Sequence, residues 1–130
     1  MQMLISHTLK AKILLLIAVS LTLAILFLSL IRVDDLPDLK VKEMDKYYHA
    51  FAYFTLTISW LSFFQIKNKI IKLKFLFLLI IVLTFFGIVI EIFQIALTNY
   101  RLFDYQDMIA NTIGVLIASS LFLGIRKKVF

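Results

Sequence analysis

The amino-acid sequence predicts an all-α membrane protein, with four transmembrane helices packed into one compact bundle. The first observation is composition: 62% of the 130 residues are hydrophobic, and the mean hydropathy of +0.99 is too high for a soluble domain. The second is segmentation, because charged residues lie in clusters that separate four long apolar runs. The third is that Lys and Arg are concentrated in alternate connecting segments.

The first apolar run covers residues 13–31, carries no charge and follows Lys10 and Lys12. As a helix it would measure about 28 Å, which is enough to cross the hydrocarbon core of a bilayer. A cleaved signal peptide is the alternative, but the small-x-small candidate at residues 18–20 comes too soon after the run begins. We therefore predict an uncleaved first span.

Three further apolar runs follow the first. The second begins close to His49, the third is apolar apart from Glu91 and Gln94, and the fourth begins at Asp107. There are no internal repeats and no segment with the composition of a soluble domain. We interpret the chain as a single membrane domain over residues 1–130, with spans at about 13–31, 47–66, 75–98 and 107–125.

The basic residues predict the topology. The amino end, residues 67–74 and the carboxyl end together hold nine of the fourteen Lys and Arg residues and none of the eight acids. Cytoplasmic segments are enriched in Lys and Arg, so both termini are expected in the cytoplasm. The same distribution explains the net charge of +6 by anchoring at anionic headgroups, and no nucleic-acid partner is expected.

Two of the predicted helices each carry a stripe of small or polar residues. One stripe is Thr84, Gly87, Glu91, Gln94 and Thr98, and the other is Asp104, Asp107, Asn111, Gly114 and Ala118. Positions three and four apart share a helix face, and polar stripes in membrane helices normally turn away from lipid. With the predicted topology, His49, Glu91 and Asn111 are expected to face one another in a shallow pocket at the external surface.

The segment around His49 offers a candidate general base. Asp45 and His49 are four residues apart, as are His49 and Tyr53, so all three share one helix face. A carboxylate that orients an imidazole is a common general-base arrangement. The alternative is that Asp45 caps the second helix and Lys46 lies at the headgroups. An imidazole inside a span nevertheless requires a partner, which favours a functional role for His49.

Glu91 is the only acid well inside an apolar run. A lone carboxylate there costs roughly 2.5 kcal/mol or more unless it is paired or protonated. Gln94, one turn later, could hydrogen-bond to Glu91 or to a shared ligand. The structural alternative is an ion pair of Glu91 with Arg101 or His49 that ties helices together.

A third group is formed by Arg101, Asp104, Asp107 and Asn111. Arg101 could clamp a phosphate or carboxylate with two hydrogen bonds, or it could neutralise the nearby acids. Asp107 is also a natural N-cap for the fourth helix. Gly114 with Ala118 is interpreted as a close helix–helix contact.

Several chemistries are disfavoured by missing motifs. The chain has no cysteine, no Gly-rich phosphate loop and no serine near the predicted polar pocket. Asp45, His49, Glu91 and Asp107 include metal-ligand types, but there is no H-E-x-x-H motif and the residues lie on three helices. We therefore expect neither a metal nor a cofactor.

The order of these motifs resembles the VanZ-like family of small bacterial membrane proteins. The match runs through Asp-Lys-x-x-His with a following Tyr, Glu-x-x-Gln, and Arg-x-x-Asp-x-x-Asp-x-x-x-Asn-x-x-Gly, over about residues 44–125. Ala118 stands where a second glycine is common, which bears on packing. The resemblance implies a multi-pass protein of the bacterial cytoplasmic membrane, and the family's founding member is associated with resistance to teicoplanin, a lipoglycopeptide antibiotic.

Two functional hypotheses follow, beside a purely structural one. The preferred hypothesis is binding or modulation of amphipathic envelope components, such as lipid headgroups, lipid-linked cell-wall precursors or lipoglycopeptides. The second is an enzyme acting on a lipid-linked substrate, with His49, Glu91 and Asp107 as candidates for acid–base or metal chemistry. The third treats the polar residues as a scaffold between helices. The expected ligand-binding residues are Asp45, Lys46, His49, Tyr53, Glu91, Gln94, Arg101, Asp104, Asp107 and Asn111.

Overall fold

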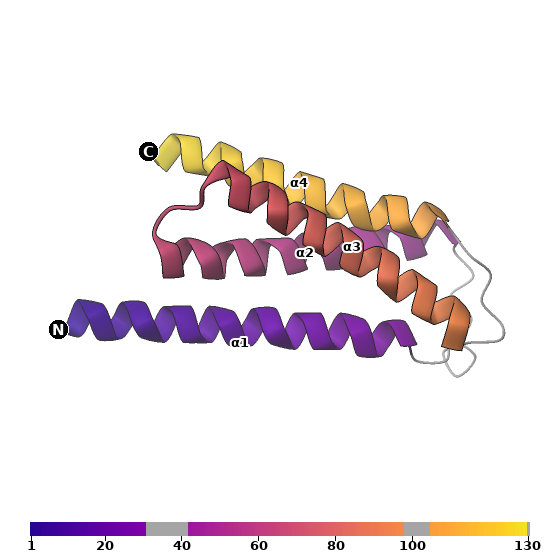
Figure 1. Ribbon diagram of the computed structural model, residues 1–130, viewed down its shortest axis with the longest axis horizontal. Coiled ribbons are helices and arrows are strands. Elements are labelled where there is room, and N and C mark those ends of the chain that lie inside the picture. Colours follow the sequence, from indigo (N-terminus) through magenta and orange to yellow (C-terminus); the bar gives the residue numbers. More distant parts are fainter. Residues whose placement is uncertain (31–41, 98–104, 130) are drawn as a thin grey trace.

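The computed structural model describes residues 1–30, 42–97 and 105–129, with side chains described for residues 1–30, 46–97 and 105–126 (Figure 1). These residues form four α-helices and contain no strand, which confirms the predicted all-α class. The helices are α1 (Gln2–Leu30), α2 (Lys42–Asn68), α3 (Leu73–Leu97) and α4 (Tyr105–Val129).

The helices begin earlier than the apolar runs do, which corrects two predictions about caps. Asp45 is the fourth residue of α2 rather than its N-cap, and Asp107 is the third residue of α4. A carboxylate in the first turn is still favoured there, because the exposed N–H groups give that end of the helix a partial positive charge. Likewise α1 begins at Gln2, where the sequence suggested a basic lead up to Lys12.

Helix α2 is the central element of the bundle. It packs most extensively against α4 and next against α1, whereas α3 lies mainly on α4 and crosses the others obliquely (Figure 1). The N-terminus, the C-terminus and the turn between α2 and α3 all lie at one end of the bundle. The start of α2, the end of α3 and the start of α4 therefore lie at the opposite end.

Glycine allows α2 and α4 to approach closely. A Cβ atom built on Gly114 would collide with the carbonyl oxygen of Ala50 and lie 3.0 Å from the backbone nitrogen of Phe54. Ala118, one turn further along α4, is fully buried. The predicted small-residue contact between helices is therefore present, and it fixes how α2 and α4 face each other.

The interior is divided between an apolar core and buried polar residues. Tyr53, Leu56, Leu83 and Val115 form one core cluster, contributed by α2, α3 and α4. Near the termini, the guanidinium of Arg126 donates a hydrogen bond to the carbonyl oxygen of Ile71. Many large apolar side chains point outward, while Glu91, Gln94, Asp107 and Asn111 are almost completely buried; this is the distribution expected of a protein surrounded by lipid.

Within the part of the chain that the structure describes, three helices are long and apolar enough to cross a membrane: α1, α3 and residues Tyr105–Arg126 of α4. Helix α2 is also long enough to cross a membrane, but its hydropathy is lower. It carries several hydroxyl-bearing residues as well as Trp60 and Gln65 between its two ends. Several of these hydroxyls donate within α2 itself, as Thr57 does to the carbonyl oxygen of Tyr53 at 2.6 Å and Ser59 to that of Leu56 at 2.8 Å. Their polarity is therefore largely satisfied inside the helix.

Candidate functional site: a buried polar cluster at one end of the bundle

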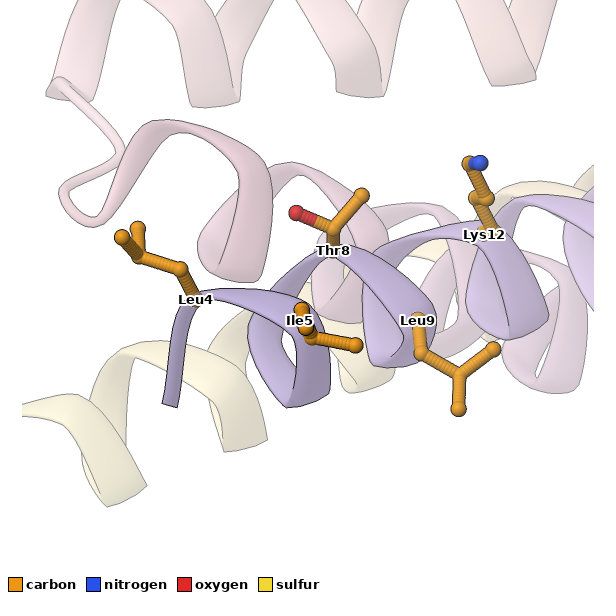
Figure 2. Close-up of a pocket in the computed structure, with 5 residues that line it drawn as sticks. All are labelled: Leu4, Ile5, Thr8, Leu9 and Lys12. Atoms are coloured by element: carbon orange, nitrogen blue, oxygen red, sulfur yellow. The ribbon is translucent and has the colours of Figure 1, made fainter. Parts of the chain in front are cut away.

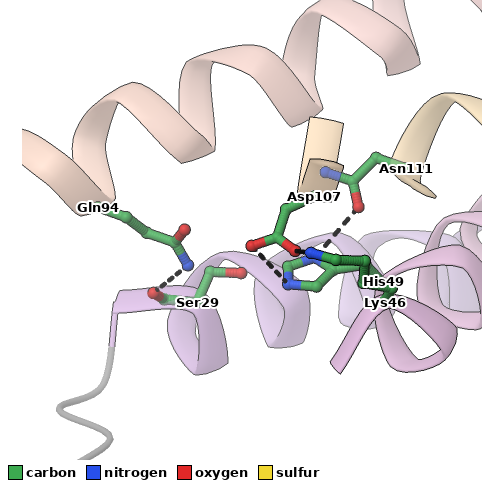
Figure 3. A network of polar contacts seen from close by, with 6 residues as sticks. All are labelled: Ser29, Lys46, His49, Gln94, Asp107 and Asn111. Atoms are coloured by element: carbon green, nitrogen blue, oxygen red, sulfur yellow. Dashed lines mark hydrogen bonds and ion pairs between the residues drawn. The ribbon is translucent and has the colours of Figure 1, made fainter. Parts of the chain in front are cut away.

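A cluster of polar side chains lies at the end of the bundle away from both termini (Figure 3). Helix α2 supplies Lys46 and His49, α3 supplies Gln94, and α4 supplies Asp107 and Asn111. Glu91 belongs to the same group, because its carboxylate lies close to His49 and Asp107. We call these six residues the polar cluster.

His49 is held between two residues of α4. Its Nδ1 lies 3.1 Å from the Oδ1 atom of Asn111, and its Nε2 lies 3.7 Å from the Oδ2 atom of Asp107 (Figure 3). Asp107 and Asn111 are four residues apart on a helix, so both side chains face α2 together. The close approach at Gly114, less than one further turn along, brings this face of α4 against α2.

Asp107 connects the two basic groups of the cluster. Its Oδ1 atom accepts from the ammonium of Lys46 at 3.2 Å, while its Oδ2 atom faces His49. The side chain of Asp107 is 7% exposed, whereas that of Lys46 is 29% exposed. The carboxylate is therefore buried, and the partly exposed side chain of Lys46 reaches it from the rim of the cluster.

Glu91 enters the cluster from α3. His49, Glu91 and Asp107 each contribute one nitrogen or oxygen atom of a kind that binds metals, and these three atoms lie within 4.8 Å of one another. Glu91 is only 3% exposed, so its carboxylate is enclosed by the bundle and does not face the lipid. Because the three side chains come from three different helices, their convergence depends on the tertiary fold, and the sequence shows only their helical faces.

Helix α1 contributes a backbone group that sequence analysis did not identify. The side-chain amide of Gln94 donates to the carbonyl oxygen of Ser29 at 2.7 Å (Figure 3). Ser29 is in the last turn of α1, where carbonyl oxygens have no partner within the helix. The sequence could have predicted only that the last carbonyl groups of an apolar helix need hydrogen-bond donors from elsewhere. It could not have predicted that Gln94 is the donor.

The floor of the cluster is formed where Tyr53 and Asn111 meet Gly87. A Cβ atom on Gly87 would lie 3.2 Å from both the Nδ2 atom of Asn111 and the Cε1 atom of Tyr53. Tyr53 is 2% exposed, and its hydroxyl oxygen has no hydrogen-bond partner among the described residues. The absence of a side chain at Gly87 therefore makes room for two polar groups at this depth.

The structure brings together most of the residues that the sequence singled out. His49, Glu91 and Asn111 share one region, as expected from the two polar stripes. The described carboxylates near His49 are those of Asp107 and Glu91, which lie on other helices; the predicted contact of His49 with Asp45 stays a prediction. The side chain of Asp45, together with Arg101 and Asp104, lies outside the described residues.

A separate depression lies along the first turns of α1 (Figure 2). Its volume is about 320 Å³, and its lining is Leu4, Ile5, Thr8, Leu9 and Lys12. It is at the end of the bundle that holds the termini, opposite the polar cluster. With neither an acid nor an imidazole in its lining, it has none of the chemistry of the cluster.

Comparisons with protein-family models, with curated proteins and with solved structures give no match to this chain. The polar cluster is therefore interpreted from its own geometry.

Proposed function

We propose that this chain is a multi-pass protein of the bacterial cytoplasmic membrane, similar to the VanZ-like family, that binds the headgroups of amphipathic envelope components at its external face. In this proposal all four helices cross the membrane and both termini are cytoplasmic. Helix α2 crosses with the hydroxyls of Thr55, Thr57 and Ser59 bonded to carbonyl oxygens of the same helix, as for Thr55 to Phe51 at 2.9 Å. The lower hydropathy of α2 is tolerated because α2 is the central helix, covered by its neighbours.

The observation that carries the proposal is the segregation of polar groups along the bundle. One end holds the basic turn between α2 and α3 and both termini, and the other holds the buried polar cluster (Figure 1). Under the positive-inside rule the basic end is cytoplasmic, so the cluster faces the periplasmic or external side. Buried ionisable groups within membrane helices usually mark a binding or reaction site.

The chemistry of the cluster favours a headgroup that combines an anion with hydrogen-bonding groups. Lys46 is the partly exposed cation at the rim, and the buried amides of Gln94 and Asn111 offer donors and acceptors below it. Phosphate-bearing lipids, lipid-linked cell-wall precursors and lipoglycopeptides share this combination of a polar, anionic head and an apolar tail. The apolar outer surfaces of the helices would accommodate the tail.

The test is lipid retention by matched lysine variants of α2. Purification in mild detergent and mass spectrometry of bound lipids should show a specific phospholipid or lipid-linked precursor on the wild type. Lys46→Gln should reduce the retained amount about tenfold, because it removes the rim cation, while Lys67→Gln at the other end of α2 should leave it unchanged. Equal retention by both variants, or only a random sample of membrane lipids on the wild type, would contradict the proposal.

The contact between His49 and Asp107 favours an enzyme as the second candidate. An imidazole beside a buried carboxylate can accept a proton from a substrate and hold the resulting charge. In an enzyme, Glu91→Gln and His49→Ala should each abolish the phenotype that the wild type restores to a deletion strain, and the double variant should be no worse, because groups that act together are non-additive. Full complementation by Glu91→Gln would rule against this candidate.

A further inference from the structure

Three potential metal ligands converge in the polar cluster from three helices. His49 of α2, Glu91 of α3 and Asp107 of α4 each place one nitrogen or oxygen atom within 4.8 Å of the other two. The two carboxylates are buried, with Glu91 3% and Asp107 5% exposed. Two buried carboxylates and an imidazole this close together are a donor set that can hold a cation.

The hydrogen bond to Asn111 orients the imidazole. The Oδ1 atom of Asn111 is only an acceptor, so the proton of a neutral His49 lies on Nδ1, which is 3.1 Å away. The lone pair of the neutral ring is then on Nε2 and points toward Asp107. Fixing one ring nitrogen so that the other can bind a cation is the usual arrangement of metal-ligating histidines.

The spacing between His49 and Asp107 suits a bridging ion better than a direct hydrogen bond. The distance from Nε2 to Oδ2 is 3.7 Å, beyond the 2.7–3.2 Å range of N–H···O bonds. Two ligands bound at about 2.1 Å in a tetrahedral geometry lie about 3.4 Å apart. Because the Oδ1 atom of Asp107 holds Lys46, its Oδ2 atom remains directed at the space between the three ligands.

A second observation at the same place is the hydroxyl of Tyr53. It is buried, has no hydrogen-bond partner among the described residues, and belongs to the ring that meets Asn111 at Gly87. A buried phenol at the edge of the cluster can donate to a carboxylate oxygen that does not bind the ion, or to a water bound to it. The site thus offers three ligands together with outer partners, namely Asn111, Lys46 and Tyr53.

We propose that His49, Glu91 and Asp107 bind one divalent transition-metal ion, with Zn²⁺ or Mn²⁺ as the class that one imidazole and two carboxylates favour. The ion would have at least one open position facing the rim, where an anionic group of a ligand could bind. The metal site does not depend on the headgroup-binding proposal, since it is complete without a lipid. The alternative is a cluster held together by hydrogen bonds and ion pairs alone, without any metal.

The two histidines of the chain provide a matched test. His7, in the second turn of α1, is exposed and lies at the end of the bundle opposite His49. Protein purified in detergent and stripped with chelator would be titrated with Zn²⁺ and Mn²⁺, and bound metal would be counted by elemental analysis after gel filtration. We expect about one ion per chain for the wild type and for His7→Ala. His49→Ala should weaken binding by about tenfold or more.

A second variant, Glu91→Gln, separates loss of a metal ligand from loss of the fold as the reason for weaker metal binding. It keeps the size of the side chain while removing its charge. It should also weaken binding about tenfold, at an unchanged helical circular-dichroism spectrum and gel-filtration profile. Co²⁺ added to the stripped wild type should give a visible ligand-field spectrum that His49→Ala lacks. Absence of bound metal in the wild type, or equal binding by His7→Ala and His49→Ala, would overturn the metal site and favour a cluster held by hydrogen bonds and ion pairs alone. Lipid retention measured on the stripped protein tests headgroup binding separately.

Discussion

At Gly114 the backbones of α2 and α4 approach so closely that one added carbon would collide with the carbonyl group of Ala50. That carbonyl is part of a helix and cannot rotate aside as a flexible side chain could. The contact lies one turn from Asn111, which holds His49. Packing at this glycine and the geometry of the polar cluster are therefore linked.

Gly114→Ala should destabilise the protein by about 1–3 kcal/mol, the usual cost of forcing extra volume into a packed interior. Gly124→Ala is the matched control on the same helix, because a Cβ atom there meets nothing within 4 Å. It should be neutral or raise stability by about 0.5–1 kcal/mol, since alanine favours the helix. Thermal unfolding in detergent measures both. Similar melting temperatures for the two variants would show that α2 and α4 are not in close contact.

Sequence patterns predicted which helix faces carry the polar residues, but they did not specify the contacts between atoms of different helices. The stripes through Glu91 and Asn111 were predicted, and both residues are buried in the cluster. Asp45 was predicted as the carboxylate that orients His49, and its side chain lies outside the described residues; the contact that the structure adds is with Asp107, 58 residues after His49. Helical periodicity fixes neighbours within a helix, whereas contacts between helices depend on how the helices pack.

At the scale of the elements, α1 is the helix with the least buried surface. Among its residues only Ala18 is fully enclosed, and its polar contacts with the rest of the bundle include two hydrogen bonds. The indole of Trp60 donates to the hydroxyl of Thr22 at 3.0 Å, and Gln94 donates to the carbonyl oxygen of Ser29. Without a hydrophobic driving force in lipid, such bonds and close packing hold α1 against its neighbours.

Thr22→Val should therefore loosen α1, because it removes the acceptor of Trp60 at nearly constant volume. The expected loss is about 0.6 kcal/mol, the average for hydrogen bonds between membrane helices. Thr55→Val is the control, since the hydroxyl of Thr55 bonds only to the carbonyl oxygen of Phe51 in its own helix, and it should change stability little. Unfolding curves in mixed detergent micelles would compare the two. An equal loss for both variants would mean that the Trp60 bond adds nothing.

The elements themselves were largely predictable, and their boundaries were not. Each predicted apolar run lies mostly within one of the four helices, because a stretch long enough to cross lipid must also bond its own backbone. The runs end at charges, whereas helices can continue into the headgroup region. For this reason α1 and α2 begin before the predicted spans, and Asp45 and Asp107 fall inside the first turns.

At the scale of the whole molecule, charge and polarity are separated along the bundle axis. The turn between α2 and α3 carries Lys69 and Lys72, and Arg126 secures the adjacent end of α4 to that turn through the carbonyl oxygen of Ile71. The acids described within the helices lie at the opposite end. This arrangement gives the molecule a defined orientation if it sits in a membrane, with its basic end at the cytoplasmic leaflet.

Reporter fusions test that orientation. Fusions after Lys128 or within residues 67–74 should report the cytoplasm, and fusions near Lys40 or Asn99 should report the external side, because the basic segments are retained inside. An alkaline phosphatase and a fluorescent protein at the same positions give opposite signals and serve as mutual controls. An external carboxyl terminus would place the polar cluster in the cytoplasm and contradict headgroup binding at the outer leaflet.

In the proposed topology, the length of α1 has a consequence for the cytoplasmic surface of the membrane. Its 29 residues extend about 43 Å, whereas a bilayer's hydrocarbon core is about 30 Å thick. With Leu30 at the outer boundary, the inner boundary falls near Lys10 and Lys12, and about two turns of helix project beyond it. Those turns carry the exposed Leu4, Ile5 and Leu9. An untilted α1 would therefore hold apolar side chains among the inner headgroups, and tilting it would draw them towards the hydrocarbon. The angle itself follows from how α1 packs against α2 and α3, so the tilt of the whole bundle would decide where these side chains lie.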